Sequence, residues 1–418
     1  MDVITSIGEK IVLANAPFAQ GGEGEVRKII SAPPCYTNCC AKIYYAKKHT
    51  KKQAKEQADK IKFMVDNPPD EIKGKGFMIG WPLATIHHLN KEFIGFIMPL
   101  AFSGSEQLSV LTSHKLWHKL NSDWYKYSRD NGISALVARL KLINNIAIPI
   151  HLLHKTGKYV LKDFKPQNVL VTHSGQITIC DMDSIQITNG QKLLFHATVA
   201  TAEYIPPEYY HKGVGKIVLN AGEKNVVFSN AAENPQRTST TAPLEKSWDS
   251  FAISVVFYQL LFGLHPYQVI PKVQHNPDSL SVSENISDDL FPFGSNTHKI
   301  ANVPKLHHKF AALPQNIQNL FQRSFSAISD QRPNAEEWGK NIHEIIKNMG
   351  DVPLPPPPAP PPPPPPPPVI PIPDPKPYIG TRGGTRGGTR GGTGEGCMAV
   401  LFLIVSIGII IVGLVVNS

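Results

Sequence analysis

The sequence lacks several features that define common protein classes. Its five cysteines in 418 residues are too few for a disulfide framework, and Cys35, Cys39 and Cys40 have no second Cys/His pair at zinc-finger spacing. The opening residues, MDVITSIGEK, contain no basic segment followed by an apolar one, so we expect no secretory signal peptide. Reduced thiols in a cytosolic domain fit this cysteine usage best.

A block of lysines and arginines interleaved with aromatic residues is also absent. The net charge is nevertheless +9, from 42 Lys and Arg against 33 Asp and Glu. Part of the excess lies on one predicted helix and in the tail, at Lys47, Lys48, Lys51, Lys52, Lys55, Arg382, Arg386 and Arg390. Such a surface is either simply solvated or attracted to anionic lipid, and we expect no nucleic-acid partner.

Charge is missing altogether between Met398 and Val416, where the sequence reads MAVLFLIVSIGIIIVGLVV. At about 1.5 Å per residue, a helix of this length spans the roughly 30 Å hydrocarbon core of a bilayer. The basic residues lie on its N-terminal side, which favours a cytosolic position for the rest of the chain. We therefore predict a membrane protein with a transmembrane tail anchor at 397–416, in preference to the alternative of a buried core helix.

Two low-complexity segments precede this run. Residues 351–377 are dominated by proline, which fixes φ and lacks an N–H donor, so we predict an extended polyproline II rod there. Residues 378–396 repeat the unit TRGG, which cannot build a core and is predicted to be flexible. We interpret both as a stalk that lifts a folded domain off the membrane. Docking of an SH3 or WW domain on the prolines is the second interpretation.

The first 348 residues change in character near residue 100. Before it, short β-like runs such as GEVRKII and FIGFIMPL surround one helical stretch, Thr50 to Asp66. After it, SWDSFAISVVFYQLLFGLHPY indicates a buried helix, and apolar residues follow one helix face at Leu136, Leu140, Ile143, Ala147, Ile150 and Leu153. We expect an α+β domain at 1–348, with a β-rich N-lobe at about 1–100 and a helical C-lobe at about 101–348.

A glycine-rich turn lies between two of the predicted strands. The segment AQGGEGEV supplies Gly21, Gly22, Gly24 and Val26. Glycines let the backbone of such a turn approach phosphate groups, and Val26 would cover an adenine ring. Alone this signal is weak, because glycine-rich turns are common.

A lysine follows at the right place to add to this signal. Lys42, in CAKIY, falls on the next predicted strand, where a lysine pairs with nucleotide phosphates and with a carboxylate of the following helix. Glu56 is the leading candidate for that carboxylate and Asp59 is the other. The spacing does not decide between them.

The stretch YVLKDFKPQNVLV carries a more specific pattern. It places Asp163, Lys165 and Asn168 at the positions D-x-K-x-x-N, and Asp181 follows in CDMDS. Asp163 would accept the proton of an attacking hydroxyl group, and Lys165 would neutralise a phosphoryl group in transfer. Asn168 and Asp181 offer the oxygen ligands that magnesium prefers.

Together these motifs resemble the protein kinase family over residues 1 to 348, nearest a bacterial branch with D-x-D-S in place of D-F-G. YIPPE places Pro207 and Glu208 at the family's P-E positions, Asp249 begins the buried helix, and Arg332 in DQRPN would pair with Glu208. The resemblance implies a bilobal fold, ATP and Mg²⁺, and phosphate transfer to Ser or Thr of a protein substrate. It also places Met98 and Leu100 among the nucleotide-binding residues.

Four family residues are missing. Leu161 replaces a histidine with a packing role, and Lys162 replaces an arginine that receives an activation-loop phosphate. Asp183 replaces the glycine after the metal ligand and could add a carboxylate near magnesium, while Met182 can fill the apolar site of the usual Phe. Thr198 and Thr201 are possible phosphorylation sites, but no receiver is evident.

Three functions fit these observations. The first is an active, membrane-anchored Ser/Thr protein kinase with catalytic residues Lys42, Asp163 and Lys165. The second is a pseudokinase scaffold, which would not need the retained polar residues. The third is a kinase-fold enzyme acting on a small molecule or lipid, which the peptide-docking elements YIPPE and WDSFAIS oppose. We favour the first.

Overall fold

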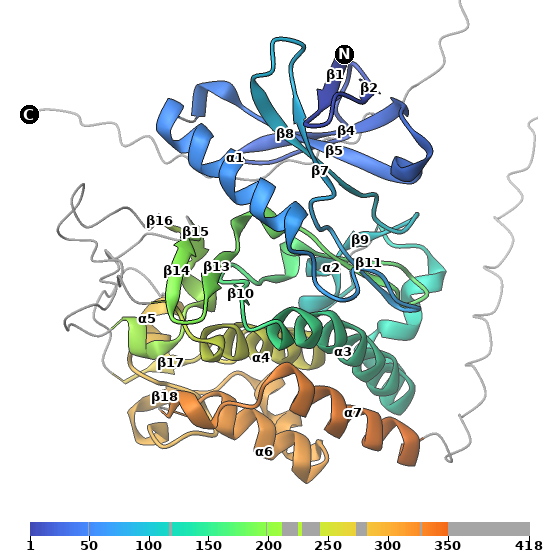
Figure 1. Ribbon diagram of the computed structural model, residues 1–418. Coiled ribbons are helices and arrows are strands. Elements are labelled where there is room, and N and C mark those ends of the chain that lie inside the picture. Colours follow the sequence, from blue (N-terminus) through green and yellow to red (C-terminus); the bar gives the residue numbers. More distant parts are fainter. Residues whose placement is uncertain are drawn as a thin grey trace, which may run out of the picture. The chain divides into compact units, whose positions relative to one another are not determined.

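The computed structural model describes residues 1–48, 50–116, 119–197, 199–210, 225–227, 243–272, 282–326 and 328–349. The chain divides into two units after Pro353, and the first, Met1–Pro353, is compact. The predicted proline rod, TRGG segment and tail anchor lie outside the described residues. The account below therefore concerns the first unit, which has the two expected lobes (Figure 1).

The N-terminal lobe is built on a seven-stranded sheet of order β2-β1-β7-β8-β5-β4-β3. The strands are β1 Asp2–Thr5, β2 Lys10–Leu13, β3 Ala19–Gln20, β4 Gly24–Ser31, β5 Cys39–Tyr44, β7 Ala84–His87 and β8 Phe93–Pro99. An additional pairing of β2 with β4 closes the sheet on itself. Alternation along β5 buries Ala41 and Ile43 in a small apolar core and turns Lys42 and Tyr44 to the opposite face.

One long helix, α1 Lys51–Asp66, packs beside this sheet against β7 and β8 (Figure 1). Thr50 caps its start in a capping box with Gln53, which satisfies two N–H groups that the first turn leaves without partners. The helix buries Ile61, Met64 and, unexpectedly for a charged residue, Lys60. The predicted helix is thus confirmed, with Thr50 as its cap.

The C-terminal lobe is mainly helical. Its helices are α2 Ser109–Thr112, α3 Gly132–Lys155, α4 Lys246–Phe262, α5 Val282–Ser287, α6 Gln315–Ser324 and α7 Ala335–Met349. Nearly every residue of α4 is buried, as its uniformly apolar sequence predicts, and α3 packs along α7. The predicted apolar face of α3 lies in the main core, with only Leu136 partly buried.

Short strands carry the loops at the junction of the lobes. They are β6 Phe77–Ile79, β9 Glu106–Gln107, β10 Tyr159–Val160, β11 Val169–Val171, β12 Ile177–Ile179, β13 Gln186–Asn189 and β14 Lys192–Phe195. Two further ladders pair β15 Val199–Thr201 with β16 Asn225–Val227, and β17 Ile270–Pro271 with β18 Ile300–Asn302. The turn between β10 and β11 carries Asp163 to Asn168, and Asp181 follows β12 closely.

Within the described part of the chain, one helix is long and apolar enough to cross a membrane by length and composition alone, Arg129–Lys155. Half of its most apolar window is buried inside the protein. Arg139, on the same helix, is buried and donates to the carbonyl oxygens of Leu111 and Leu260 at 3.0 and 2.6 Å. We therefore assign this segment to the core of the C-terminal lobe.

Candidate active site

The loop that carries Asp163 is held by the start of α4. Asp249, fully buried, accepts hydrogen bonds from the backbone N–H groups of Leu161 and Lys162 at 2.7 and 2.9 Å. Trp248 donates from Nε1 to the carbonyl oxygen of Lys162 at 2.8 Å, and His154 Nε2 lies 2.7 Å from Asp249. A buried carboxylate is stable only with such partners, so helix and loop fix each other.

Asp163 and Lys165 meet as the spacing predicts. Lys165 Nζ lies 2.7 Å from Asp163 Oδ2. Sequence reasoning missed the third member: Thr201 donates its hydroxyl hydrogen to Asp163 Oδ1 at 2.7 Å and accepts from Lys165 Nζ at 2.8 Å. Thr201 is therefore engaged in the site in this structure, while Thr198 lies outside the described residues.

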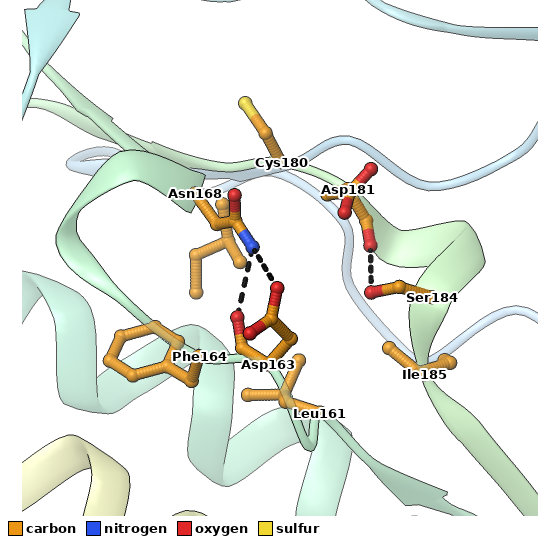
Figure 2. A pocket seen from close by; sticks show the side chains of 9 residues that line it. Leu161, Asp163, Phe164, Asn168, Cys180, Asp181, Ser184 and Ile185 are labelled. Atoms are coloured by element: carbon orange, nitrogen blue, oxygen red, sulfur yellow. Dashed lines mark hydrogen bonds between the residues drawn. The ribbon is translucent and has the colours of Figure 1, made fainter. Parts of the chain in front are cut away.

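Asn168 and Asp181 line the same pocket as Asp163, together with Leu161, Phe164, Ile179, Cys180, Ser184 and Ile185 (Figure 2). Asn168 donates from Nδ2 to the carbonyl oxygen of Asp163 at 2.9 Å, which leaves its Oδ1 turned away from that residue. Asp181 adopts left-handed backbone geometry, with φ 60° and ψ 36°. Such geometry is uncommon outside glycine and often accompanies functional sites.

These donors suit magnesium better than a softer metal. Both Asn168 and Asp181 offer oxygen, and Mg²⁺ commonly takes one or two protein carboxylates together with substrate phosphates. No group of three or more His, Cys, Asp or Glu side chains with metal-binding geometry occurs among the described residues. The arrangement thus fits an ion that the protein shares with a phosphate ligand.

Lys42 reaches this pocket from β5, but not with the predicted partner. Its Nζ lies 2.7 Å from Asp181 Oδ1 and 2.7 and 2.8 Å from the two oxygens of Asp183. Burial opposes the charged form, yet the attraction of both carboxylates raises the pKa of Lys42 above its usual value. The pKa of Asp181 is lowered, first by the charge of Lys42.

The expectation that Glu56 pairs with Lys42 is wrong in this structure. Glu56 lies on the exposed face of α1, 4.0 Å from Lys52 Nζ, and Asp59 is exposed as well. The helix instead turns Gln57 and Lys60 inward, because the apolar residues Ile61 and Met64 set its buried face. Asp183, which was expected near magnesium, forms an ion pair with Lys42 instead.

Two buried lysines contact the segment that follows Asp183. Lys60 donates to the carbonyl oxygens of Asp183 at 2.6 Å and His196 at 3.5 Å. Lys162 donates to the carbonyl oxygen of Ala197 at 2.8 Å. Burial lowers the pKa of Lys60 to about 8 and lowers that of Lys162 well below its usual value. In this structure Lys162 thus holds backbone where the family places a phosphate-binding arginine.

The glycine-rich turn closes tightly, with Gly21 N–H donating to the carbonyl oxygen of Gly24 at 2.8 Å. A Cβ on Gly24 would lie 2.3 Å from the Ile43 carbonyl oxygen, so the ladder between β4 and β5 requires glycine there. At Gly22 an added Cβ would meet nothing within 4 Å. The protein's own packing therefore does not explain that glycine.

The remaining predicted nucleotide-binding residues lie on the strands around Lys42. Val26 stands opposite Lys42 in the ladder of β4 and β5. Met98, on β8, pairs with Cys40 of β5. Leu100, just beyond β8, donates its N–H to the Asn38 carbonyl oxygen at 2.8 Å. Val26 and Met98 thus lie on the two strands that flank β5, and Leu100 directly follows one of them.

The residues predicted to fill apolar sites or to form a stabilising ion pair lie where the sequence predicts. Met182 and Leu161 are buried in the main core, where each fills an apolar site. Arg332 forms a two-pronged ion pair with Glu208, at 2.6 and 2.7 Å, which confirms the predicted contact.

Comparison with known proteins agrees with this geometry. The family model described as protein kinase domain matches residues 119–341, more than half of the chain. The rat citron rho-interacting kinase is 25% identical over 122 residues, which is 29% of this chain and 5% of that protein. The mouse serine/threonine-protein kinase MRCK gamma is 27% identical over 150 residues, 34% of this chain and 8% of that protein.

The chain thus spans only a small part of the length of these relatives. A solved structure, the kinase domain of a Toxoplasma gondii rhoptry antigen, covers 83% of this chain and 86% of its own, with 12% identity and a TM-score of 0.49. The family match covers the C-terminal lobe with Asp163, Asn168 and Asp181, whereas Lys42 is joined to them by geometry. Because the family model matches more than half of the chain, the chain belongs to the protein kinase family.

Proposed function

We propose that the protein is an ATP- and magnesium-dependent protein kinase that phosphorylates Ser or Thr. The single observation that carries this proposal is the convergence of Lys42, Asp163, Lys165, Asn168 and Asp181 at one place, from segments up to 139 residues apart. A scaffold without catalysis would need no such convergence of buried charge, because each desolvated ion costs free energy unless it is paired.

The proposed reaction follows from these positions. The substrate hydroxyl oxygen forms a bond to the γ-phosphorus while the bond from that phosphorus to the β–γ bridging oxygen breaks, and ADP leaves with the electron pair. Asp163 accepts the hydroxyl proton. Lys165 balances the negative charge of the transferred group, and Lys42 holds the α- and β-phosphates.

Asn168 and Asp181 would hold Mg²⁺. When bound, the ion would neutralise negative charge on the phosphate groups. Asn168 would contribute a neutral oxygen and Asp181 a charged one, which are the ligand types that Mg²⁺ prefers.

The preference for Ser and Thr has two supports. The curated relatives named above include a serine/threonine-protein kinase. Asp163 and Lys165 both contact an aliphatic hydroxyl, that of Thr201, which supports a preference for groups of this kind.

The test is transfer of radiolabelled γ-phosphate from ATP to a generic basic protein by the full chain, with and without magnesium. We expect magnesium-dependent incorporation that Asp163→Asn and Lys42→Met abolish. Equal incorporation in all three proteins would contradict the catalytic assignment. Label that appears only in lipid or a small molecule would replace the protein substrate by the third alternative, and no transfer with retained nucleotide binding would favour the pseudokinase.

We also propose that residues 397–416 anchor the chain in a membrane, with the kinase domain cytosolic. The support is the uncharged run Met398 to Val416. The full chain is expected to stay with membranes in alkaline carbonate, and a variant carrying Ile409→Arg and Ile410→Arg is expected to be released. Release of the unaltered chain would contradict the anchor. An SH3 or WW partner for the prolines stays a prediction.

A further inference from the structure

The carboxylate of Asp183 is held by two residues of β5. Its side chain is 1% exposed, and its oxygens accept from Lys42 Nζ at 2.7 and 2.8 Å and from the hydroxyl of Tyr44 at 2.7 Å. Tyr44 in turn accepts from Gln57 Nε2 at 2.7 Å. The network therefore runs from α1 through β5 to the segment after Asp181.

We propose that Asp183 is the positioning partner of Lys42, and that it performs from the metal-binding segment the task that a helix carboxylate would otherwise perform. This inference rests on the proposed function for its catalytic consequence. Its structural content, which carboxylate holds Lys42, stands independently of whether the protein transfers phosphate.

The helix offers no competing carboxylate at this place. The inward positions of α1 are occupied by Gln57, which is neutral, and by Lys60, which is positive. Glu56 is largely exposed, with 62% of its side chain accessible. A lysine ammonium in a desolvated position requires an opposite charge, and the described residues supply it through Asp181 and Asp183.

The two aspartates have different tasks in this arrangement. Asp181 is 38% exposed, lines the pocket and is held by Lys42 through one of its oxygens, Oδ1. Asp183 is buried and also fixed through its backbone, because Lys60 donates to its carbonyl oxygen at 2.6 Å. If Asp181 held magnesium, Asp183 would be the carboxylate that remains to hold Lys42 in place.

The position of Lys42 would then not depend on a movement of α1. In a kinase whose lysine partner lies on the helix, a shift of the helix breaks the pair. Here the partner lies two residues from the proposed metal ligand, so assembly of the metal segment and placement of the lysine are a single event. Lys60 couples the helix to the same segment through a backbone oxygen instead of a charge pair.

The decisive measurement is a pair of double-variant comparisons, read as the midpoint temperature of unfolding, Tm, of the full chain. Asp183→Asn keeps the size of the side chain and its capacity to accept from Tyr44, and Lys42→Met removes the ammonium group. Because the effects of residues in direct contact do not add, we expect the loss of Tm in the double variant Lys42→Met with Asp183→Asn to be smaller than the sum of the two single losses. For Lys42→Met with Glu56→Gln, the losses are expected to add.

A second reading follows catalysis. The Asp183→Asn protein is expected to show a higher KM for ATP, and its kcat/KM is expected to fall about tenfold or more. Asp183→Glu, which keeps the carboxylate, is expected to retain a kcat/KM closer to that of the unaltered chain than Asp183→Asn does. A general loss of stability would not be repaired in this way. Asp66→Asn, on the exposed end of α1, is the matched control.

Two outcomes would overturn the inference. One is additive losses of Tm for Lys42→Met and Asp183→Asn; the other is non-additive losses for Lys42→Met and Glu56→Gln, which would return the partner to the helix. If Asp183→Asn does not fold, the comparison of Lys42→Met with Glu56→Gln decides alone. Absence of phosphate transfer by the unaltered chain would refute the proposed function, while the Tm comparisons would still identify the partner of Lys42.

Discussion

The hydroxyl of Thr201 donates a hydrogen bond to Asp163 at 2.7 Å, across 38 positions of sequence. The same hydroxyl accepts from Lys165 at 2.8 Å, so one small side chain ties the segment before YIPPE to the two residues proposed to act on the transferred phosphate. The contact fixes the orientation of the Asp163 carboxylate, because its other oxygen is already paired with Lys165.

Thr201→Val should therefore reduce phosphate transfer. Loss of the hydroxyl leaves Asp163 and Lys165 each short of one partner, and we expect kcat to fall about tenfold or more, since an unsatisfied charged group costs about 1–3 kcal/mol. Thr201→Ser should retain most activity. Steady-state kinetics of both variants are the measurement. The matched control is Thr178→Val, because the buried Thr178 hydroxyl has no hydrogen-bond partner; equal losses at 178 and 201 would contradict the specific role.

The ion pair of Arg332 and Glu208 is expected to stabilise the C-terminal lobe. The Arg332 side chain is fully buried, and Glu208→Gln would leave its charge without a counterion. We expect a loss of about 3 kcal/mol in the free energy of unfolding, measured by denaturant titration. The control is Glu337→Gln at the more exposed Arg323–Glu337 pair, expected to cost less than about 1 kcal/mol. A larger loss of unfolding free energy in Glu337→Gln than in Glu208→Gln would contradict the stabilising role of the Arg332–Glu208 pair.

Two buried histidines should make the fold sensitive to acid. His265 donates from Nε2 to the Glu203 carbonyl oxygen, and His307 Nδ1 accepts from the Tyr258 hydroxyl at 2.6 Å, so both rings are neutral. Burial is the largest cause that lowers the pKa of His265 to about 3 and of His307 to about 4.

Unfolded histidines bind protons near pH 6.5, before the folded ones do, so stability is present above that pH and falls as the pH decreases toward 4. We expect Tm to decrease over this window. The decrease should be shallower in His307→Gln and unchanged in His173→Gln, whose ring is exposed. Identical slopes in all three proteins would exclude His307 as a cause.

The glycine turn offers a test that separates folding from ligand binding. Gly24→Ala should lower Tm, because its Cβ would collide with the Ile43 carbonyl oxygen, whereas Gly22→Ala should leave Tm unchanged. If Gly22 is needed for phosphate approach, its variant should instead raise the KM for ATP. Thermal unfolding and ATP titration measure the two effects, and a lower Tm in Gly22→Ala would show that packing explains this glycine too.

Motif spacing predicted the residues whose partners lie in the same short loop. Asp163, Lys165 and Asn168 are close in sequence, and the turn between β10 and β11 brings them together. The helices α1 and α4 also followed from the sequence, since a cap or an unbroken apolar run marks each of them. Local signals were sufficient for these features.

Contacts that depend on the rotation of a helix were not predictable in the same way. Glu56 was the leading candidate to pair with Lys42 and Asp59 the other, but Ile61 and Met64 decide which side of α1 is buried, and both acidic residues are exposed. Lys60 and Thr201 were missed because their partners lie 123 and 38 residues away. The periodicity of Gln57, Lys60, Ile61 and Met64 was the one signal that could have indicated the inward face.

The attachment of the catalytic loop to α4 explains why altered motif letters need not mean altered chemistry. Asp249 and Trp248 form hydrogen bonds with peptide N–H and C=O groups of residues 161 and 162. Every amino acid other than proline supplies both groups. Side chains at these two positions can therefore change to leucine and lysine without moving Asp163. Backbone groups position the loop, whereas its side chains carry the chemistry. At residues 161 and 162 only the side chains depart from the family pattern, so these departures do not change the position of the loop.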